Sequence, residues 1–214
     1  MKKELVGTNA IILANRFNPS VTNQAWLVRN EIVEEQQIQS GGVFTDGIAQ
    51  LNSDQFSLLV VPNHLQFTPF VDANLQQDLI VRKLGKIVES LPHTPFHALG
   101  LNFSWHVWKR ERSDVAALTV EMLGKNAGRF QEQFHDDSAL FGAYMSMDYE
   151  GFRLKLEIKP IETVDDELRI QFAFNFHRNL ESVDSPASTI SGMLTRWDVC
   201  HAKARGIIEK GLST

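Results

Sequence analysis

The sequence is poor in several residue types, and each scarcity excludes a class of protein. Its 214 residues include one cysteine, Cys200, so an internal disulfide is impossible and the disulfide-rich secreted class is excluded. No apolar run approaches the roughly 20 residues that a membrane helix needs. The lysines near Met1 have no apolar stretch behind them, so we expect no signal peptide and no membrane association. Together these absences predict a cytoplasmic protein.

Positive charge is also scarce. The chain has 21 Lys and Arg against 26 Asp and Glu, a net charge of −5, and a pI near 5.8. Proteins that bind nucleic acid draw most of their non-specific affinity from a basic surface. Anionic membranes attract polybasic segments for the same reason. The balance therefore argues against nucleic-acid partners and against a membrane surface.

Recognisable catalytic motifs are missing as well. There is no glycine-rich phosphate loop, no Gly-x-Ser-x-Gly and no Cys-x-x-Cys. His135-Asp136-Asp137 offers three metal-ligand types, but adjacent residues rarely converge on one ion, so a surface turn is the better interpretation. Cys200 and His201 are neighbours in a predicted helix and cannot face each other as nucleophile and base. We expect no metal and no cofactor.

Phenylalanine, by contrast, is abundant. Fourteen Phe stand against two Tyr, and because Phe has no polar group, most of these rings should lie in a core. The length suits one large domain. Strand and helix patterns follow one another in two similar passes. The first pass predicts strands at Asn9–Phe17, Val43–Leu51, Gln55–Val61 and His64–Phe67, a short helix capped by Thr22 or Asn23, and a long helix over Asp72–Leu91.

The second pass repeats this order. It predicts strands at Phe96–Trp108, at Ala139–Asp148 and at positions 152–159 and 168–177. A helix capped by Ser113 follows the first of these strands, and then a polar stretch over Lys125–Ser138 with a turn of helix at Phe130–Phe134. A long helix runs from Pro186 to Gly211, and its buried stripe contains Ile190, Leu194, Trp197 and Ile208. The predicted fold is α+β: one domain, 1–214, with a mostly antiparallel sheet, helices on one face, and two related halves at about 1–95 and 96–214. Chance alternation of strands and helices is the alternative to duplication.

Three short stretches carry a resemblance. They are Asn15-Arg16-Phe17-Asn18-Pro19-Ser20, then Pro92-His93-Thr94-Pro95 with Ala98-Leu99-Gly100-Leu101-Asn102, then Phe174-Asn175-Phe176-His177. With the order of elements, the chain resembles an uncharacterised, sporadically distributed bacterial protein family of unknown function. That resemblance implies no activity and no catalytic residues. The doubled element order is also similar to TATA-binding-protein-like folds, a likeness of fold that transfers no function.

Two predicted strands place polar side chains on one face each. Period-two alternation puts polar residues opposite the Phe-rich face, with Trp108 beside them. These residues are Asn102, Ser104 and His106 on one strand and Arg169, Gln171, Asn175 and His177 on the other. If the strands are neighbours, the surface could bind a polar ligand, with histidine as base or hydrogen-bonding group. The alternative is the solvated face of an antiparallel sheet.

The absence of catalytic motifs favours a non-enzymatic binding or assembly module, acting through the open sheet face on an unknown protein partner or by self-association as a homo-oligomer. The alternative is an enzyme or small-ligand binder that uses the polar face around His106 and His177. On that alternative the two histidines should lie within about 10 Å of each other in a concavity.

Overall fold

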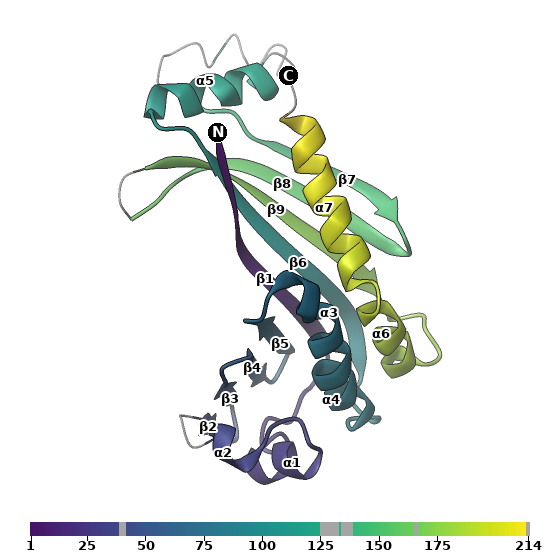
Figure 1. The fold of residues 1–214 in the computed structure, drawn as a ribbon. Coiled ribbons are helices and arrows are strands. Elements are labelled where there is room, and N and C mark those ends of the chain that lie inside the picture. Colours follow the sequence, from purple (N-terminus) through teal and green to yellow (C-terminus); the bar gives the residue numbers. More distant parts are fainter. Residues whose placement is uncertain (39–41, 125–132, 134–138, 165–166, 213–214) are drawn as a thin grey trace. The chain divides into compact units, whose positions relative to one another are not determined.

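The computed structural model describes residues 1–38, 42–124, 133, 139–164 and 167–212 (Figure 1). Its strands form one antiparallel sheet of nine strands, accompanied by helices, which confirms the predicted α+β class. The strands are β1 (Lys2–Ala14), β2 (Gly42–Phe44), β3 (Ala49–Asn52), β4 (Phe56–Val61), β5 (His64–Pro69), β6 (Phe96–Trp108), β7 (Ala143–Tyr149), β8 (Phe152–Glu162) and β9 (Leu168–Asn179). The helices are α1 (Gln24–Arg29), α2 (Glu35–Ile38), α3 (Ala73–Ile80), the π-helical turn η1 (Val81–Gly85), α4 (Lys86–Glu89), α5 (Arg112–Met122), α6 (Pro186–Leu194) and α7 (Trp197–Gly211).

The order of strands across the sheet is β2-β3-β4-β5-β1-β6-β9-β8-β7. Each long strand, β1 or β6, is followed in sequence by a group of antiparallel strands. The last strand of each group, β5 or β9, then lies beside its own long strand. This is the strand order that a duplicated unit would have. Superposition of the two halves stays a prediction.

The chain divides into two compact units, which are described separately. The first unit comprises Met1–Gly7, Asn102–Phe176 and Lys203–Thr214, and the second unit comprises Thr8–Leu101 and His177–Ala202. Each unit takes segments from both sequence halves, so the units are not the predicted halves. The single domain built of two related halves therefore stays a prediction.

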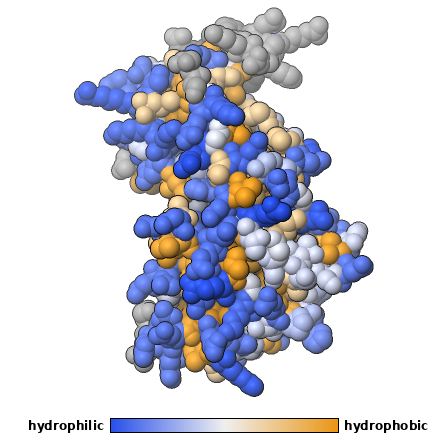
Figure 2. Space-filling model, turned by 45° about the vertical axis from the view of Figure 1, so that its right-hand side comes forward, coloured by the Kyte–Doolittle hydropathy of each residue, from blue (hydrophilic) through white to orange (hydrophobic). Residues whose placement is uncertain are grey.

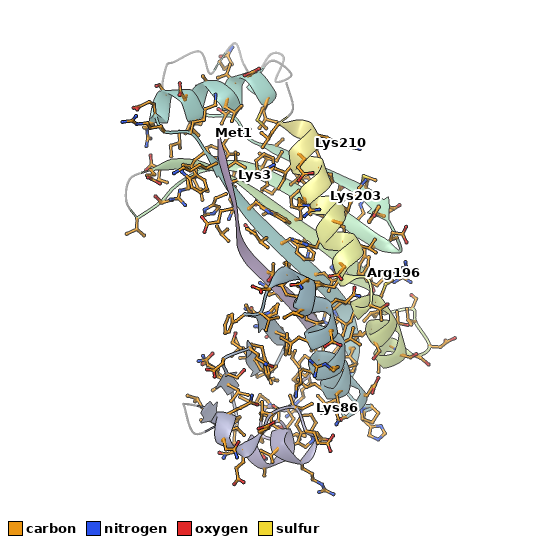
Figure 3. All side chains as sticks on the ribbon, viewed as in Figure 1. Met1, Lys3, Lys86, Arg196, Lys203 and Lys210 are labelled. Atoms are coloured by element: carbon orange, nitrogen blue, oxygen red, sulfur yellow. The ribbon has the colours of Figure 1, made fainter. Side chains whose placement is uncertain are left out.

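Aromatic side chains fill the core of the first unit. Phe176 contacts the rings of Phe103, Phe152 and Tyr149 edge-on, with centroid distances of 5.9, 6.2 and 6.1 Å. Edge-to-face contacts of this kind add to the energy of apolar burial. On the edge of the sheet, Lys203 of α7 lies over the Tyr149 ring at 4.9 Å (Figure 3). The richness in Phe is thus explained by a core, as the composition predicts.

A tight turn joins β7 and β8 in the first unit. Tyr149 pairs with Phe152, and the two residues between them, Glu150 and Gly151, have φ values of 49° and 81°. Two positive φ values in a two-residue hairpin are the mark of a type I′ turn. Glycine suits such a position, whereas Glu150 occupies it with a backbone that side chains disfavour.

Aliphatic and aromatic residues in register form the core of the second unit. Phe67 on β5 pairs with Ala10 on β1 and with Leu58 on β4, and the Phe56 and Phe67 rings stack at 4.7 Å. Helices α3 and α4 and the turn η1 between them contribute the buried residues Leu79, Ile87 and Leu84, respectively. Figure 1 shows α6 beside α4, and the hydroxyl of Ser191 on α6 donates to the Glu89 carboxylate at 3.4 Å.

Helix α1 begins and ends with hydrogen bonds that its sequence explains. Asn23 is the N-cap, and its side chain accepts from the Trp26 amide at 3.1 Å, as predicted. At the other end, the Ile32 and Glu31 amides donate to the carbonyls of Leu27 and Val28. This is a Schellman motif with Glu31, at φ 53°, in the position where glycine is usual.

Three predicted elements are interrupted in the structure. The strand over Val43–Leu51 is two strands, because the Thr45 amide donates to the Ile48 carbonyl and closes a turn. The helix over Asp72–Leu91 contains the π-helical turn η1. The helix from Pro186 to Gly211 is two helices, α6 and α7, separated by Thr195 and Arg196.

Several predicted boundaries are also wrong. β1 starts at Lys2, seven residues before Asn9, and β7 starts at Ala143. Helix α5 has Glu111 at its N-cap position, so Ser113 lies inside the helix. The predicted turn at Phe130–Phe134 lies outside the described residues.

The predicted buried stripe of the C-terminal helices is confirmed. Ile190, Leu194 and Trp197 are fully buried, Ile208 is 1% exposed, and Cys200 is a buried free thiol. No helix in the described part of the chain is long and apolar enough to span a membrane.

Candidate functional site

The polar residues predicted on β6 and β9 do form a shared surface in the first unit. From Asn102 onward in β6, and along β9 as far as Phe176, buried residues alternate with half-buried ones, and the half-buried positions carry the polar side chains. We call the following six residues the polar row: Asn102, Ser104, His106, Arg169, Gln171 and Asn175. Phe-rich positions on the opposite face of the same strands make the core, so the row marks the face that is left partly open.

Cross-strand contacts hold the polar row together. The Asn175 side-chain amide donates to the side-chain oxygen Oδ1 of Asn102 at 2.7 Å. The Gln171 amide donates to the Ser104 hydroxyl at 3.3 Å. The side chains thus meet in pairs from neighbouring antiparallel strands, which is the arrangement that stabilises a sheet face.

Arg169 occupies the end of the row and has two neighbours. Its guanidinium carbon lies 4.5 Å from the centre of the Trp108 ring, a cation–π contact. Its Nη2 atom is 2.6 Å from the Glu167 carboxylate, with the Arg169 side chain 20% exposed. The ion pair and the aromatic ring fix the direction of the guanidinium. Trp108 therefore lies on the polar face, as the alternation predicts, and is anchored there.

His106 lies between these contacts and is electrostatically distinct. Burial lowers its pKa, the nearby Arg169 charge lowers the pKa further, and the Glu4 carboxylate opposes both effects. The neutral imidazole is therefore favoured over the imidazolium. Its Nδ1 atom is buried and has no hydrogen-bond partner among the described residues. A buried ring nitrogen without a partner is costly, which makes this atom a point where a bound group would gain a hydrogen bond.

The structure brings five predicted residues into contact pairs or ion pairs: Asn102, Ser104, Arg169, Gln171 and Asn175. The sixth, His106, joins them through the Arg169 charge. His177 belongs to the second unit, so its predicted approach to His106 stays a prediction.

Sequence reasoning missed two residues of the site, Glu4 and Glu167. Glu4 lies near the start of β1, and Glu167 lies in the turn before β9. Neither belongs to the alternating pattern of β6 or β9. Only the closeness of Glu167 to Arg169 in sequence could have signalled one of them.

The bonding in the row limits its chemistry. The Ser104 hydroxyl accepts from Gln171, and the Nδ1 atom of His106 is unpartnered, so this nitrogen does not activate Ser104 as a nucleophile. No group of three or more His, Cys, Asp or Glu that could hold a metal ion occurs in the part of the chain that the structure describes. His135-Asp136-Asp137 lies outside the described residues. The row offers amide, hydroxyl, imidazole and guanidinium groups for recognition.

A scan against protein-family models and a search of curated protein sequences find no match to this chain.

Proposed function

We propose that this chain is a non-enzymatic binding module that contacts a protein partner, or a second copy of itself, through the polar row on β6 and β9. The observation that carries the proposal is the cross-strand pairing of the row, Asn175 with Asn102 and Gln171 with Ser104, on a half-exposed face. Side chains already fixed by neighbours lose little freedom on binding, and that saving favours recognition.

The chemical character of the row supports a protein partner. Amides and hydroxyls both donate and accept, and Trp108 with Arg169 supplies the aromatic and guanidinium groups that are enriched in protein interfaces. On the molecular face drawn in Figure 2, hydrophobic residues form separate patches among hydrophilic ones. We keep the cytoplasm as the proposed location, because a chain with a single cysteine cannot form the internal disulfides that are typical of small secreted proteins.

The test places a wedge in the row without removing any of its contacts. Ala173 lies on β9 between Gln171 and Asn175, on the same half-buried face. Ala173→Arg adds a long cation at the centre of the proposed interface. The matched control is Ser188→Arg, because Ser188 is an exposed residue of α6 in the second unit.

Two measurements decide the outcome. Sedimentation velocity over a range of concentrations detects self-association, and a photo-crosslinking residue at position 171 captures a partner in an extract of the source cells. We expect one of these signals in the parent chain, its loss in Ala173→Arg and its retention in Ser188→Arg. A monomeric parent chain whose crosslinks at position 171 do not exceed those at position 188 would contradict the proposal.

The unpartnered Nδ1 atom of His106 favours a second candidate, a small-ligand site or enzyme on the same face that includes His177. A ligand that binds only the folded state stabilises it by RT ln(1 + [L]/Kd), so the melting temperature rises with the free ligand concentration. On this candidate the His106→Ala, His177→Ala double variant stays folded and loses that stabilisation in a thermal-shift screen of metabolites. On the binding-module proposal no metabolite gives the parent chain a stabilisation that the double variant loses.

A further inference from the structure

The second unit contains a pocket that shares no residue with the polar row and that no periodic pattern in the sequence signals. It has a volume of about 490 Å³ and is formed by residues 16–18, 21–22 and 90–95. Pockets for small molecules typically span about 300–1,000 Å³. Its two walls come from the segment after β1 and the segment before β6, which are also two of the stretches that carry the family resemblance.

The backbone fixes these two segments to each other and to the sheet. The Asn15 amide donates to the Pro95 carbonyl at 3.1 Å, and the Phe17 amide donates to the Pro62 carbonyl at 2.7 Å. The rings of Phe17 and Phe96 meet edge-on at 5.9 Å. Proline restricts the backbone further along both walls. The pocket is thus built on a rigid frame, which is what a preformed binding site needs.

Apolar groups make up most of the lining surface of the pocket. The apolar residues among its eleven lining residues are Phe17, Val21, Leu91, Pro92 and Pro95. Val21 is 40% exposed, so part of its side chain is accessible to a ligand. This lining would bury the hydrocarbon body of a ligand.

The charge around the pocket has one sign. Arg16 is its charged lining residue, and none of the described lining residues is acidic, although the chain as a whole carries a net charge of −5. Arg16 has no ion-pair partner among the described residues. A guanidinium without a carboxylate partner, beside an apolar wall, matches an anionic group with at least two acceptor oxygens.

We propose that this pocket binds a small organic anion, with its charged head on the Arg16 guanidinium and its apolar body against Phe17 and Val21. The shared chemistry is an anionic oxygen group, such as a carboxylate or sulfonate, on an aromatic or aliphatic body. This site is independent of the binding-module proposal, because it lies in the other unit and shares no residue with the polar row.

Two fluorescent probes that differ mainly in charge test the proposal. 8-Anilinonaphthalene-1-sulfonate carries the anionic head, and N-phenyl-1-naphthylamine has the same ring system without it. Arg16→Gln should weaken sulfonate binding about tenfold, because it removes a charged hydrogen-bond donor. The same variant should leave the affinity for the neutral probe unchanged within about twofold. Val21→Trp should abolish the Arg16-dependent part of the signal by filling the pocket.

The matched control is Arg82→Gln, because Arg82 is an exposed arginine of the same unit that lies outside the pocket. It should bind both probes like the parent chain. Far-UV circular dichroism and the melting temperature check that each variant is folded. Equal sulfonate affinity in Arg16→Gln and the parent chain would overturn the proposal, and so would an Arg16-dependent signal that survives in Val21→Trp.

Discussion

The buried hydrogen bond between Trp197 and Gln76 offers the sharpest test of how the second unit is held together. The Trp197 indole N–H donates to the side-chain oxygen Oε1 of Gln76 at 3.2 Å, and the side-chain nitrogen Nε2 of Gln76 donates to the backbone carbonyl of Val71 at 3.2 Å. Trp197 is fully buried and Gln76 is 7% exposed, so water cannot replace the lost acceptor of the indole. Val71 is half-buried, and its carbonyl can turn to water.

The perturbation is Gln76→Leu, which keeps a similar volume and removes the acceptor. A buried donor left without a partner costs about 1–3 kcal/mol, so we expect the free energy of unfolding to fall by about 2 kcal/mol. Trp197→Phe removes the donor instead. The double variant should then be more stable than the sum of the two single losses predicts, by about 1 kcal/mol or more, because neither group is left unpaired.

Urea unfolding followed by circular dichroism measures these changes, provided the slope against urea stays constant. The neighbouring Gln77→Leu is the control. Gln77 accepts from the Asp198 amide at the start of α7 at 3.1 Å but is half-exposed, so its loss should cost less than about 1 kcal/mol. A Gln76→Leu variant within about 0.5 kcal/mol of the parent chain, or a cycle that adds within that error, would refute the reasoning.

Three further predictions concern the pH dependence and the two strained turns. The pKa of His106 is lowered in the folded state, so as pH falls the unfolded chain binds the proton first, and the free energy of unfolding should decrease below about pH 6.5. Urea unfolding at pH 7.5 and at pH 5 measures this decrease, and it should be smaller in His106→Gln. Glu150→Asn should stabilise the type I′ turn by roughly 0.5–1 kcal/mol, whereas Glu150→Val should destabilise it, as measured by thermal unfolding. Glu31→Gly should raise the melting temperature, because glycine adopts the positive φ at this position without strain. The variant also removes the exposed ion pair with Lys86, so a lower melting temperature would show that this ion pair outweighs the strain.

Local patterns in the sequence predict some elements well. Phe96–Trp108 matches β6 at both ends, because period-two alternation runs from Leu99 to Val107 and a proline precedes the strand. The alternation also predicts which face of β6 and β9 carries the polar row. Period-two patterns state which residues share a face, and the structure adds which strands are neighbours.

The errors arise where contacts distant in sequence or local turns override periodicity. The break between α6 and α7 leaves no mark in the apolar spacing, and Gln76, far away in the sequence, accepts from Trp197 at the start of α7. The strand predicted over Val43–Leu51 is divided by the turn that starts at Thr45, and the prediction overlooked Asp46-Gly47, a pair typical of turns. The pocket around Arg16 is made of two loop segments, and loops have no period from which their meeting could be predicted.

The π-helical turn η1 has a consequence for how the chain tolerates changes in length. Such a turn holds one residue more than an α-helical turn, and regular α-helix precedes and follows it. Ile80 before the turn and Ile87 after it are both fully buried, so the extra residue is absorbed without rotating either side chain out of the core. We expect a chain one residue shorter between Val81 and Gly85 to close this turn into continuous α-helix. A single-residue deletion should therefore be tolerated better here than within α3 or α4.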